Sequence, residues 1–562
     1  MYWQIERNQK MSQMDYKTPL EMFYRWEKER SQTVFLRQPI AGQWHEYNWS
    51  QVAKEVRSMA QFLHDQGLKD GARVGILSKN CAHWIMADLA IMMAGCVSVP
   101  LYPTQQAETS RYILEHSETK LVFVGKLDDW QSQEKGIPDH ITKVSFPYPD
   151  GMSAHHEWQE IIQQTQPMAA SPVPPIDQIA TIIYTSGTTG FPKGVVHTFR
   201  GLSFVGVNYC EALGFQESER FFSYLPLAHV AERSLVEMCS LYVAAQVSFV
   251  ESMETFAQNL QEVSPTAFFS VPRLWGKFQE GILQKLPQKK LDLLLSLPIV
   301  SGLIKKKVQK GLGLSQARSV GSGAAPISPA LLEWYAKLGI TIMEGYGQTE
   351  NLAYATTNRG PNMKFGSVGQ QLPNCDIKID ENTGEILIKN DAVMLGYYNE
   401  PEKTAEVLQK GYVKTGDIGE FDENGGLKIT GRLKELFKTE KGKYIAPTPI
   451  ENKFWDTSLI EQVCVTGHGL PNPVALLVLS ESARQRSRSD INAAVQSAMA
   501  SANQSLSSYE KIRQCIVVKE PWTVDGGLMT PTLKVKRHEV EKLYSPILER
   551  TRIEQSQVIW ES

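Results

Sequence analysis

The chain has 562 residues, which is too long for one hydrophobic core, so two or more domains are expected. Its composition, with 42% hydrophobic and 21% charged residues, is ordinary for a soluble globular protein. The formal net charge of −3 gives no reason to expect a nucleic-acid partner.

The cysteines and the amino terminus indicate a cytoplasmic protein. Seven cysteines are scattered without a C-x-x-C pair, which argues for a reducing compartment and against disulfides or a zinc site. The first ten residues carry Glu6, Arg7 and Lys10 and hold no apolar core typical of a signal peptide. No stretch of the sequence reaches the length needed to cross a bilayer.

Helical and extended patterns alternate from about residue 50 to residue 145. Residues 73–77, 96–102 and 120–125 are predicted strands, and 82–95 is a predicted apolar helix. Such alternation is typical of a largely parallel sheet covered by helices. Residues 168–175, rich in Ala, Ser and Pro, read as a linker into the next strand.

A predicted strand at 180–184 leads directly into Thr-Ser-Gly-Thr-Thr-Gly-Phe-Pro-Lys-Gly at 185–194. Glycines that adopt positive φ let main-chain N–H groups point at one anion, hydroxyls add donors and the lysine adds charge. The spacing is not that of the Walker loop. A flexible linker is the alternative, although linkers rarely join a core strand to a fixed Pro-Lys-Gly ending. The run predicts a phosphate cradle formed by Thr185, Ser186, Gly187, Thr188, Thr189, Gly190 and Lys193.

The segment 289–307 is mostly apolar between two groups of lysines. Asp292, Pro298 and Gly302 interrupt it. Two interpretations remain open for this segment. It contacts the surface of the inner membrane with its lysines toward the headgroups, or it is a broken surface helix that packs on the protein itself.

Two glycine-rich segments follow. In Gly-Ser-Gly-Ala-Ala-Pro at 321–326, the small side chains of Gly323, Ala324 and Ala325 would let the backbone approach a flat ring, although a tight turn fits equally well. In Gly-Tyr-Gly-Gln-Thr-Glu at 345–350, an aromatic ring between glycines can stack on a purine. Thr349 can donate to a phosphate, and Glu350 is a hard oxygen ligand for Mg²⁺.

Beyond residue 360 short predicted strands at 368–389 and 411–430 suggest a small β-rich subdomain. Within it the carboxylate of Asp417 suits a ribose diol, and Arg432 offers a planar donor fork for phosphate or ribose. A solvated aspartate at a strand end is the alternative. We place the main boundary at 431–434, which gives domains of 1–432 and 433–562.

The predicted fold is therefore α/β. A large amino-terminal domain of several subdomains combines parallel-type sheets covered by helices with the β-rich piece, and a smaller α+β domain follows it. Near the carboxyl end lies the basic stretch Leu-Met-Thr-Pro-Thr-Leu-Lys-Val-Lys-Arg at 528–537, which alone would be a solvated surface.

Together these motifs resemble the adenylate-forming, or AMP-binding, superfamily, and in particular its long-chain fatty acyl-CoA synthetases. The resemblance runs from about residue 20 to residue 545 and includes the motifs at 185–194, 346–350 and 415–417 and the basic stretch at 528–537. The segments 225–233, 270–275 and 311–314 also resemble that branch. Most members have Ser-Gly or Thr-Gly before the last motif's lysine, where this chain has Thr532-Leu533.

The resemblance implies a role for each matched position. Residues 321–326 with Tyr346 and Gly347 would line the adenine pocket, Asp417 and Arg432 would bind ribose or phosphate, and Glu350 with Thr185 would hold Mg²⁺. His229 would orient the substrate carboxylate, Thr349 would contact phosphate, and Lys534 would neutralise charge as pyrophosphate departs. Lys434 would be the hinge about which a mobile carboxyl-terminal domain rotates.

The implied activity is an acid–thiol ligase that uses ATP and Mg²⁺ to join a medium- or long-chain fatty acid to CoA. An acyl-adenylate is the intermediate, and AMP and pyrophosphate are released. Two alternatives stay open: a fatty acyl-AMP ligase that delivers the acyl group to a carrier protein, and an inactive nucleotide-binding homologue. The sequence also leaves open the acyl chain length, the oligomeric state, and whether Lys534 or Lys536 is catalytic.

Overall fold

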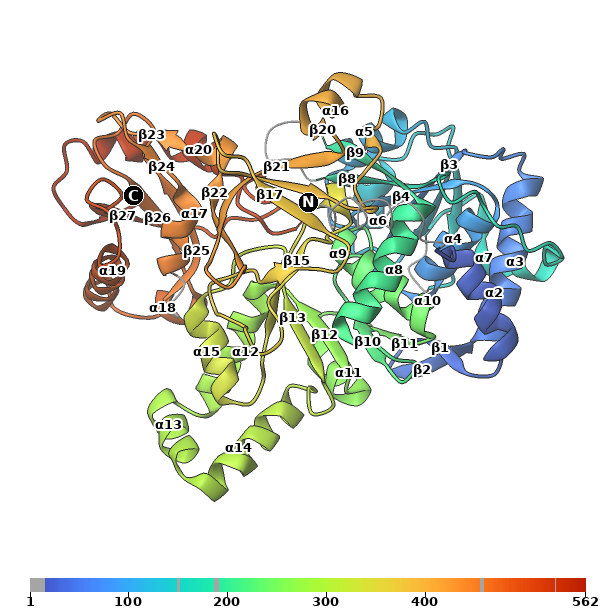
Figure 1. Ribbon diagram of the computed structural model, residues 1–562, viewed down its shortest axis with the longest axis horizontal. Coiled ribbons are helices and arrows are strands. Elements are labelled where there is room, and N and C mark those ends of the chain that lie inside the picture. The colour runs from blue at the N-terminus through green and yellow to red at the C-terminus, as the bar shows by residue number, and fades with distance from the viewer. Residues whose placement is uncertain (1–15, 149–151, 186–191, 455–458, 531, 562) are drawn as a thin grey trace, which may run out of the picture.

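A computed structural model describes residues 16–148, 152–185, 192–454, 459–530 and 532–561. It confirms the α/β fold, with a large amino-terminal domain and a smaller carboxyl-terminal domain (Figure 1). Within those ranges, no helix combines the length and apolar character needed to span a bilayer.

The first large sheet contains the strands predicted before residue 200. The helix predicted at 82–95 is α4 (Ala82–Met93), and all of its residues are buried. In the described part of the chain this sheet has eight strands, parallel from β7 to β8 and antiparallel beyond. Their order is β19 (Gly396–Tyr397), β9 (Lys193–Thr198), β8 (Ile179–Thr185), β4 (Val97–Leu101), β3 (Arg73–Ser78), β5 (Leu121–Gly125), β6 (Thr142–Ser145) and β7 (His156–Glu157).

The second large sheet carries much of the cleft described below. Counting described residues only, it has nine strands, and those from β14 to β1 run parallel. Their order is β16 (Gln370–Gln371), β15 (Thr356–Thr357), β14 (Met343–Tyr346), β13 (Ser319–Ser322), β12 (Ala267–Ser270), β10 (Arg220–Ser223), β11 (Gln246–Phe249), β1 (Val34–Ile40) and β2 (Gln43–Asn48).

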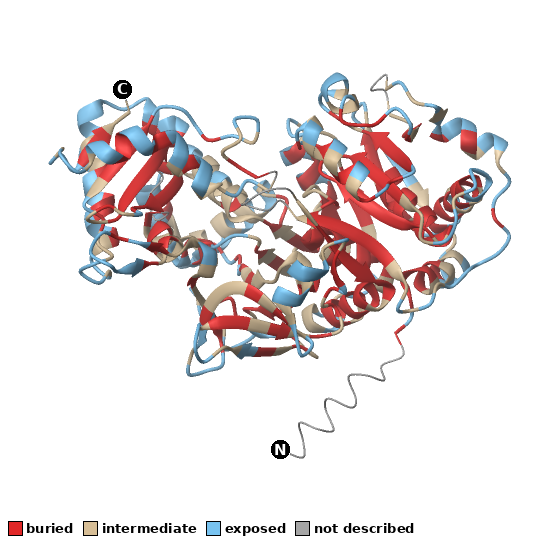
Figure 2. Ribbon diagram, turned by 90° about the horizontal axis from the view of Figure 1, so that it is seen from above, coloured by how far each residue is buried: buried red, intermediate tan, exposed pale blue. Residues whose placement is uncertain are grey.

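Helices between and around these sheets bury a large hydrophobic core between the sheets and a further core on the other face of each sheet. The helix α4 is almost entirely apolar, with His83 and Asp88 as its polar residues, and it is buried between the two sheets, where it lies with α8 and α10 (Figure 1). Figure 2 shows most of the strands of this domain as buried. The helices of this region are α2 (Pro19–Glu29), α3 (Trp49–Asp65), α5 (Ala107–His116), α6 (Trp130–Glu134), α7 (Trp158–Gln164), α8 (Phe199–Leu213), α9 (Val230–Glu232), the π-helix η1 (Arg233–Met238), α10 (Cys239–Val243), α11 (Phe256–Val263) and α15 (Pro329–Lys337).

The segment at 289–307 forms a helical hairpin that projects from the second sheet (Figure 1). It follows α12 (Pro272–Lys285) and consists of α13 (Gln288–Ser296) and α14 (Pro298–Gly311). The break at Leu297 follows from Pro298, which has no N–H to continue the first helix and favours the first position of the second.

A small β-rich piece joins the two domains. Its described strands are β17 (Asp376–Ile379), β18 (Glu385–Lys389), β20 (Leu408–Gln409), β21 (Tyr412–Phe421) and β22 (Leu427–Arg432), with α16 (Pro401–Val407) beside them. The subdomain predicted beyond residue 360 is thereby confirmed.

The carboxyl-terminal domain has a sheet with a hydrophobic core on each face. Residues of α19 pack on one face and residues of α20 on the other. Its elements are β23 (Phe437–Lys438), β24 (Tyr444–Ile445), α17 (Pro447–Glu451), β25 (Ile460–Thr466), β26 (Val474–Leu479), α18 (Glu481–Arg484), α19 (Arg488–Asn503), β27 (Gln514–Val518), α20 (Arg537–Arg550) and β28 (Val558–Trp560).

Candidate active site

One cleft of about 2080 Å³ lies between the two domains and brings the predicted residues together. Of the predicted phosphate cradle, Ser186, Gly187, Thr188, Thr189 and Gly190 lie outside the described residues. All the other predicted site residues line the cleft: Thr185, Lys193, His229, Gly323, Ala324, Ala325, Tyr346, Gly347, Thr349, Glu350, Asp417, Arg432, Lys434 and Lys534.

The two ends of the predicted phosphate cradle face each other. Thr185 ends β8, Lys193 begins the antiparallel β9, and the two residues are partners in the strand register. The Lys193 ammonium lies 4.7 Å from the centroid of the Tyr397 ring. Burial lowers the pKa of Lys193, and the positive charge of Lys434 lowers it further. The uncharged form is thereby favoured more than in water, and an anion nearby would reverse this.

The parallel strands β13 and β14 deliver the glycine-rich segments to the same edge of the second sheet. Ligands of open α/β sheets bind outside the carboxyl ends of such strands. Gly347 has no room for a side chain, because a Cβ there would come within 2.2 Å of the Ala353 carbonyl group. Ala324 adopts a φ of 65°, a left-handed conformation that costs free energy for a residue with a Cβ.

Asp417 is held by three neighbours. The Tyr346 hydroxyl and the Gln348 amide each donate to its Oδ2 at 2.7 Å. Arg432, its cross-strand partner between β21 and β22, approaches Oδ1 at 3.3 Å. The sequence did not identify Gln348 as a site residue, although it stands inside the motif at 345–350. This arrangement fixes the carboxylate and leaves Oδ1 able to accept further hydroxyl donors.

Glu350 has the donor chemistry of a Mg²⁺ ligand. Its Oε1 accepts a hydrogen bond of 2.8 Å from the Tyr397 hydroxyl, a contact that no sequence motif predicted. The described residues contain no cluster of three or more acidic, His or Cys side chains that could hold a metal alone. One carboxylate beside an anion site is how proteins usually bind Mg²⁺ together with substrate phosphates. The donor set therefore fits a metal shared with a nucleotide.

Two buried histidines have lowered pKa values, and of the two only His229 lines the cleft. Burial lowers the pKa of His229 to about 4, and Lys534 contributes to the shift. Because Nδ1 of His229 accepts the N–H of Ala231 at 3.2 Å, its proton resides on Nε2. His197 on β9 donates from Nε2 to the Thr349 carbonyl at 2.8 Å, and burial lowers its pKa to about 4.

Lys534 stands at the tip of a turn that enters the cleft from the carboxyl-terminal domain. The turn is closed by the Thr530 N–H to the Lys534 carbonyl at 2.8 Å, and Leu533 in it has a φ of 60°. Leu533 thus adopts the conformation that glycine favours, at the position where most of the superfamily has glycine. The protein around the cleft lowers the pKa of Lys534, chiefly by burial and then through Arg432. Lys536 is not among the described residues that line the cleft.

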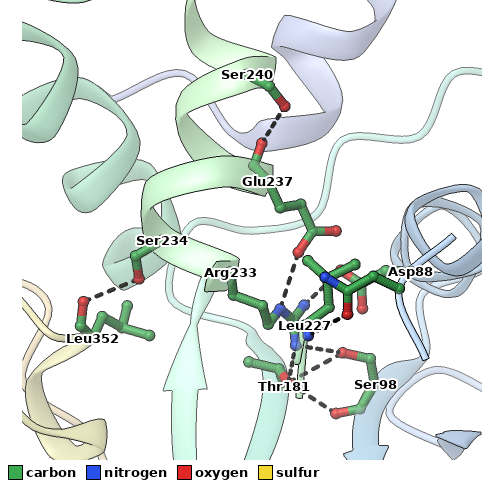
Figure 3. A network of polar contacts seen from close by, with 10 residues as sticks. Asp88, Ser98, Thr181, Leu227, Arg233, Ser234, Glu237, Ser240 and Leu352 are labelled. Atoms are coloured by element: carbon green, nitrogen blue, oxygen red, sulfur yellow. Dashed lines mark hydrogen bonds and ion pairs between the residues drawn. The ribbon is translucent and has the colours of Figure 1, made fainter. Parts of the chain in front are cut away.

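A buried ionic network lies next to residues that line the cleft (Figure 3). Arg233 in η1 contacts Asp88 of α4 at 2.5 Å and Glu237 at 3.2 Å, and all three side chains are fully buried. It also donates to Thr181 of β8 at 2.8 Å. One guanidinium thus links the strand that ends at Thr185 to the helix that follows His229.

Comparisons with known proteins agree with this geometry. The family model described as AMP-binding enzyme matches residues 23–398, and that described as AMP-binding enzyme C-terminal domain matches 435–554. The chain is 29% identical to the long-chain-fatty-acid–CoA ligase FadD15 of Mycobacterium bovis, covering 94% of this chain and 96% of that protein. It is 30% identical to long-chain-fatty-acid–CoA ligase 5 of Rattus norvegicus, covering 89% and 83%.

A solved structure has the same fold. The adenylation domain of a carboxylate reductase from Mycobacterium chelonae superposes with a TM-score of 0.82 at 21% identity, covering 96% of this chain and 92% of that one.

Proposed function

The chain belongs to the AMP-binding enzyme family, and we propose that it joins a medium- or long-chain fatty acid to CoA at the expense of ATP. An acyl-adenylate is the intermediate, and the products are acyl-CoA, AMP and pyrophosphate. The observation that carries the proposal is that residues spread from 185 to 534 line one cleft. The two long-chain-fatty-acid–CoA ligases, similar over most of their length, support the substrate class.

In the first half-reaction the fatty carboxylate attacks the α-phosphorus of ATP, and pyrophosphate leaves. Both reactants are anions, so catalysis depends on positioning and on neutralising charge. The neutral His229 donates from Nε2 to orient the carboxylate, and Thr349 donates to phosphate. Lys193 and Lys534 offset the negative charge that develops as the P–O bond breaks.

The nucleotide is held by the residues at the ends of β13, β14, β21 and β22. Tyr346 stacks on the adenine, while Asp417 accepts the ribose hydroxyls beside Arg432. Mg²⁺ bound by Glu350 and Thr185 would supply Lewis-acid stabilisation of the phosphate charge. In the second half-reaction the CoA thiolate attacks the acyl carbonyl, the carbonyl carbon–phosphate oxygen bond breaks, and AMP leaves.

The two half-reactions require different faces of the carboxyl-terminal domain. Lys534 occupies the cleft in this structure, where it serves the first step. We propose that residues 433–562 rotate about Lys434, relative to residues 1–432, before the second step. Lys434 lines the same cleft and lies in the short 3₁₀-helix η3 (Leu433–Glu435) that joins β22 to the carboxyl-terminal domain.

The rival acceptor is a carrier protein, which the site residues do not distinguish from CoA. The test is thioester formation from a chain-length series of fatty acids with ATP and Mg²⁺, offered either CoA or a pantetheinylated carrier protein. We expect acyl-CoA with medium- or long-chain acids. Acylation of the carrier alone would favour the fatty acyl-AMP ligase, and no pyrophosphate release with any acid would favour an inactive homologue.

We also propose that the α13–α14 hairpin contacts the inner membrane surface from the cytoplasmic side. Its inner face packs on the protein through residues such as Leu291, Ile304 and Val308. Its outer face exposes large apolar side chains around the turn and a series of lysines. The apolar residues, with their exposed fractions, are Leu293 (63%), Leu297 (46%), Ile299 (85%) and Leu303 (66%).

This combination suits an anionic lipid surface, because basic residues attract the headgroups while apolar side chains enter the interface. We expect the protein to bind vesicles containing anionic lipid, and Ile299→Asp with Leu297→Asp to weaken that binding strongly. Leu543→Asp, at an exposed leucine on α20, is the matched control and should bind as the native chain does. Equal vesicle binding by all variants would refute this contact.

A further inference from the structure

An ion pair spans the two domains beside the cleft. Arg273 of α12, in the amino-terminal domain, contacts Glu461 of β25, in the carboxyl-terminal domain. Both residues line the cleft, and their side chains are 35% and 29% exposed. The Nε of Arg273 is buried and meets no hydrogen-bond acceptor in the part of the chain that the structure describes. The guanidinium of Arg273 forms its ion pair with Glu461 through a different nitrogen, Nη2.

The strand that contains Glu461 also contacts the turn that contains Lys534. Glu461 lies where the register of β25 on β26 shifts, between Ile460 and Gln462, and its partly exposed side chain contacts α12, whereas the Gln462 side chain is buried. The Gln462 side chain accepts the Trp522 N–H at 2.8 Å and donates to the Trp522 carbonyl at 2.9 Å. The same amide nitrogen contacts the Met529 sulfur at 3.2 Å.

Met529 is the base of the Lys534 turn. It forms a β-bridge with Val535 across the turn, and the Thr530 hydroxyl accepts the N–H of Lys534 at 3.1 Å. A continuous series of contacts therefore runs from Arg273 through β25 to the lysine in the cleft. Displacing β25 from α12 would displace Lys534 with it.

We propose that Arg273 is a positioning residue for Lys534. Its pair with Glu461 stabilises the domain orientation in which that lysine faces the reacting phosphate. The inference rests on the proposed function, since it assigns the pair to the first half-reaction only. Rotation of the carboxyl-terminal domain for the second half-reaction separates α12 from β25, so the pair contributes nothing there.

The test measures the two half-reactions separately in Arg273→Glu, Glu461→Arg and the double charge swap. Pyrophosphate exchange into ATP reports adenylate formation, and acyl-CoA formation from supplied acyl-adenylate reports the second step. We expect each single variant to slow exchange by about five- to tenfold, because each loses a partly exposed ion pair and places two like charges side by side. The second step should stay unchanged, and the double swap should restore exchange to within about twofold.

Arg552→Glu is the matched control, because it breaks the Arg552–Glu440 pair inside the carboxyl-terminal domain without touching α12. It should change neither half-reaction. An equal loss of both steps in Arg273→Glu would indicate general damage to the fold and would overturn the inference. So would unchanged exchange, or a double swap no better than the single variants. Absence of exchange in the native chain would instead reject the proposed function.

Discussion

Two acidic groups in the cleft are each positioned by residues from another segment of the chain. Asp417 is fixed by Tyr346 at the end of β14 and by Gln348 just after it, and Glu350 by Tyr397 from β19. Carboxylates held in this way need not reorganise when a nucleotide binds, which favours preorganised electrostatic catalysis. The basic residues approach from three sides, since Lys193 lies on β9, Arg432 on β22 and Lys534 in the carboxyl-terminal domain.

Lys534 and Lys536 provide a matched pair of substitutions. Lys534→Ala removes the cation that lines the cleft, and we expect acyl-adenylate formation to fall by about a hundredfold or more, the usual loss for one transition-state donor. Thioester formation from supplied acyl-adenylate should persist. Lys536→Ala should leave adenylate formation nearly unchanged. The assignment of Lys534 would be wrong if the two variants behaved alike in pyrophosphate exchange.

His197 makes the stability of the fold depend on pH. Burial lowers the pKa of folded His197 to about 4, whereas an exposed histidine has a pKa of about 6.5. As the pH falls from about 6.5 toward 4, the unfolded chain takes up a proton that the folded chain does not, and stability is lost. His197→Gln keeps a donor for the Thr349 carbonyl but does not titrate.

We therefore expect the free energy of unfolding of His197→Gln to fall less steeply over this pH window, by up to about 1.4 kcal/mol per pH unit. Urea denaturation at several pH values between 4.5 and 7.5 measures both slopes. Parallel curves for the native chain and the variant would show that His197 does not titrate between the two states.

At the scale of elements, Arg233 joins η1, α4 and β8 in the network of Figure 3. Burial raises the pKa of Glu237 well above its ordinary value, and the nearby Asp88 raises it further, while Arg233 lowers it. A π-helix such as η1 often lies at a functional site. Here η1 begins four residues after His229. Within η1, Arg233 donates a hydrogen bond to Thr181 of β8, the strand that ends at Thr185.

Removing this guanidinium should be costly. Arg233→Met leaves Asp88 buried without its partner, and we expect a loss of about 3–5 kcal/mol in the free energy of unfolding. Arg200→Met, which breaks the exposed pair with Asp177, should cost at most about 1 kcal/mol. Denaturant titration of both variants gives the comparison. Similar losses for the two would mean that the buried network does not stabilise the fold.

The elements that the sequence predicted well are those whose pattern is decided locally. The mostly apolar α4 and the strands β3, β4, β5 and β8 agree with prediction to within a residue or two, because their burial shows directly in their composition. The π-helix was not predicted, and for 289–307 one of the two interpretations was a broken helix that packs on the protein, but not the tight α13–α14 hairpin that its two halves form. The first depends on a network between distant residues, and the second on how two short helices pack.

The site could be predicted where the chemistry lies within a short motif. Gly347, Asp417 and Lys534 stand in such motifs, and the structure brings them to one cleft. Their supporting contacts could not be predicted, since Tyr397 and Arg273 meet their partners only through the packing of sheets and domains. No local pattern encodes a contact between residues separated by nearly 200 positions, such as Arg273 and Glu461.

For the whole molecule, the cleft exists because the small domain closes against the second large sheet. Its walls come from residues of both domains. Under the proposed rotation about Lys434, the relative position of the domains is part of the catalytic cycle.

Exchange of labelled pyrophosphate into ATP tests the central claim most directly. With Mg²⁺ present and CoA absent, we expect exchange that requires a medium- or long-chain fatty acid and disappears in folded Asp417→Ala, which lacks the proposed ribose contact. Exchange that does not depend on a fatty acid, or no exchange with any acid by a folded native chain, would contradict an acyl-adenylate formed in this cleft.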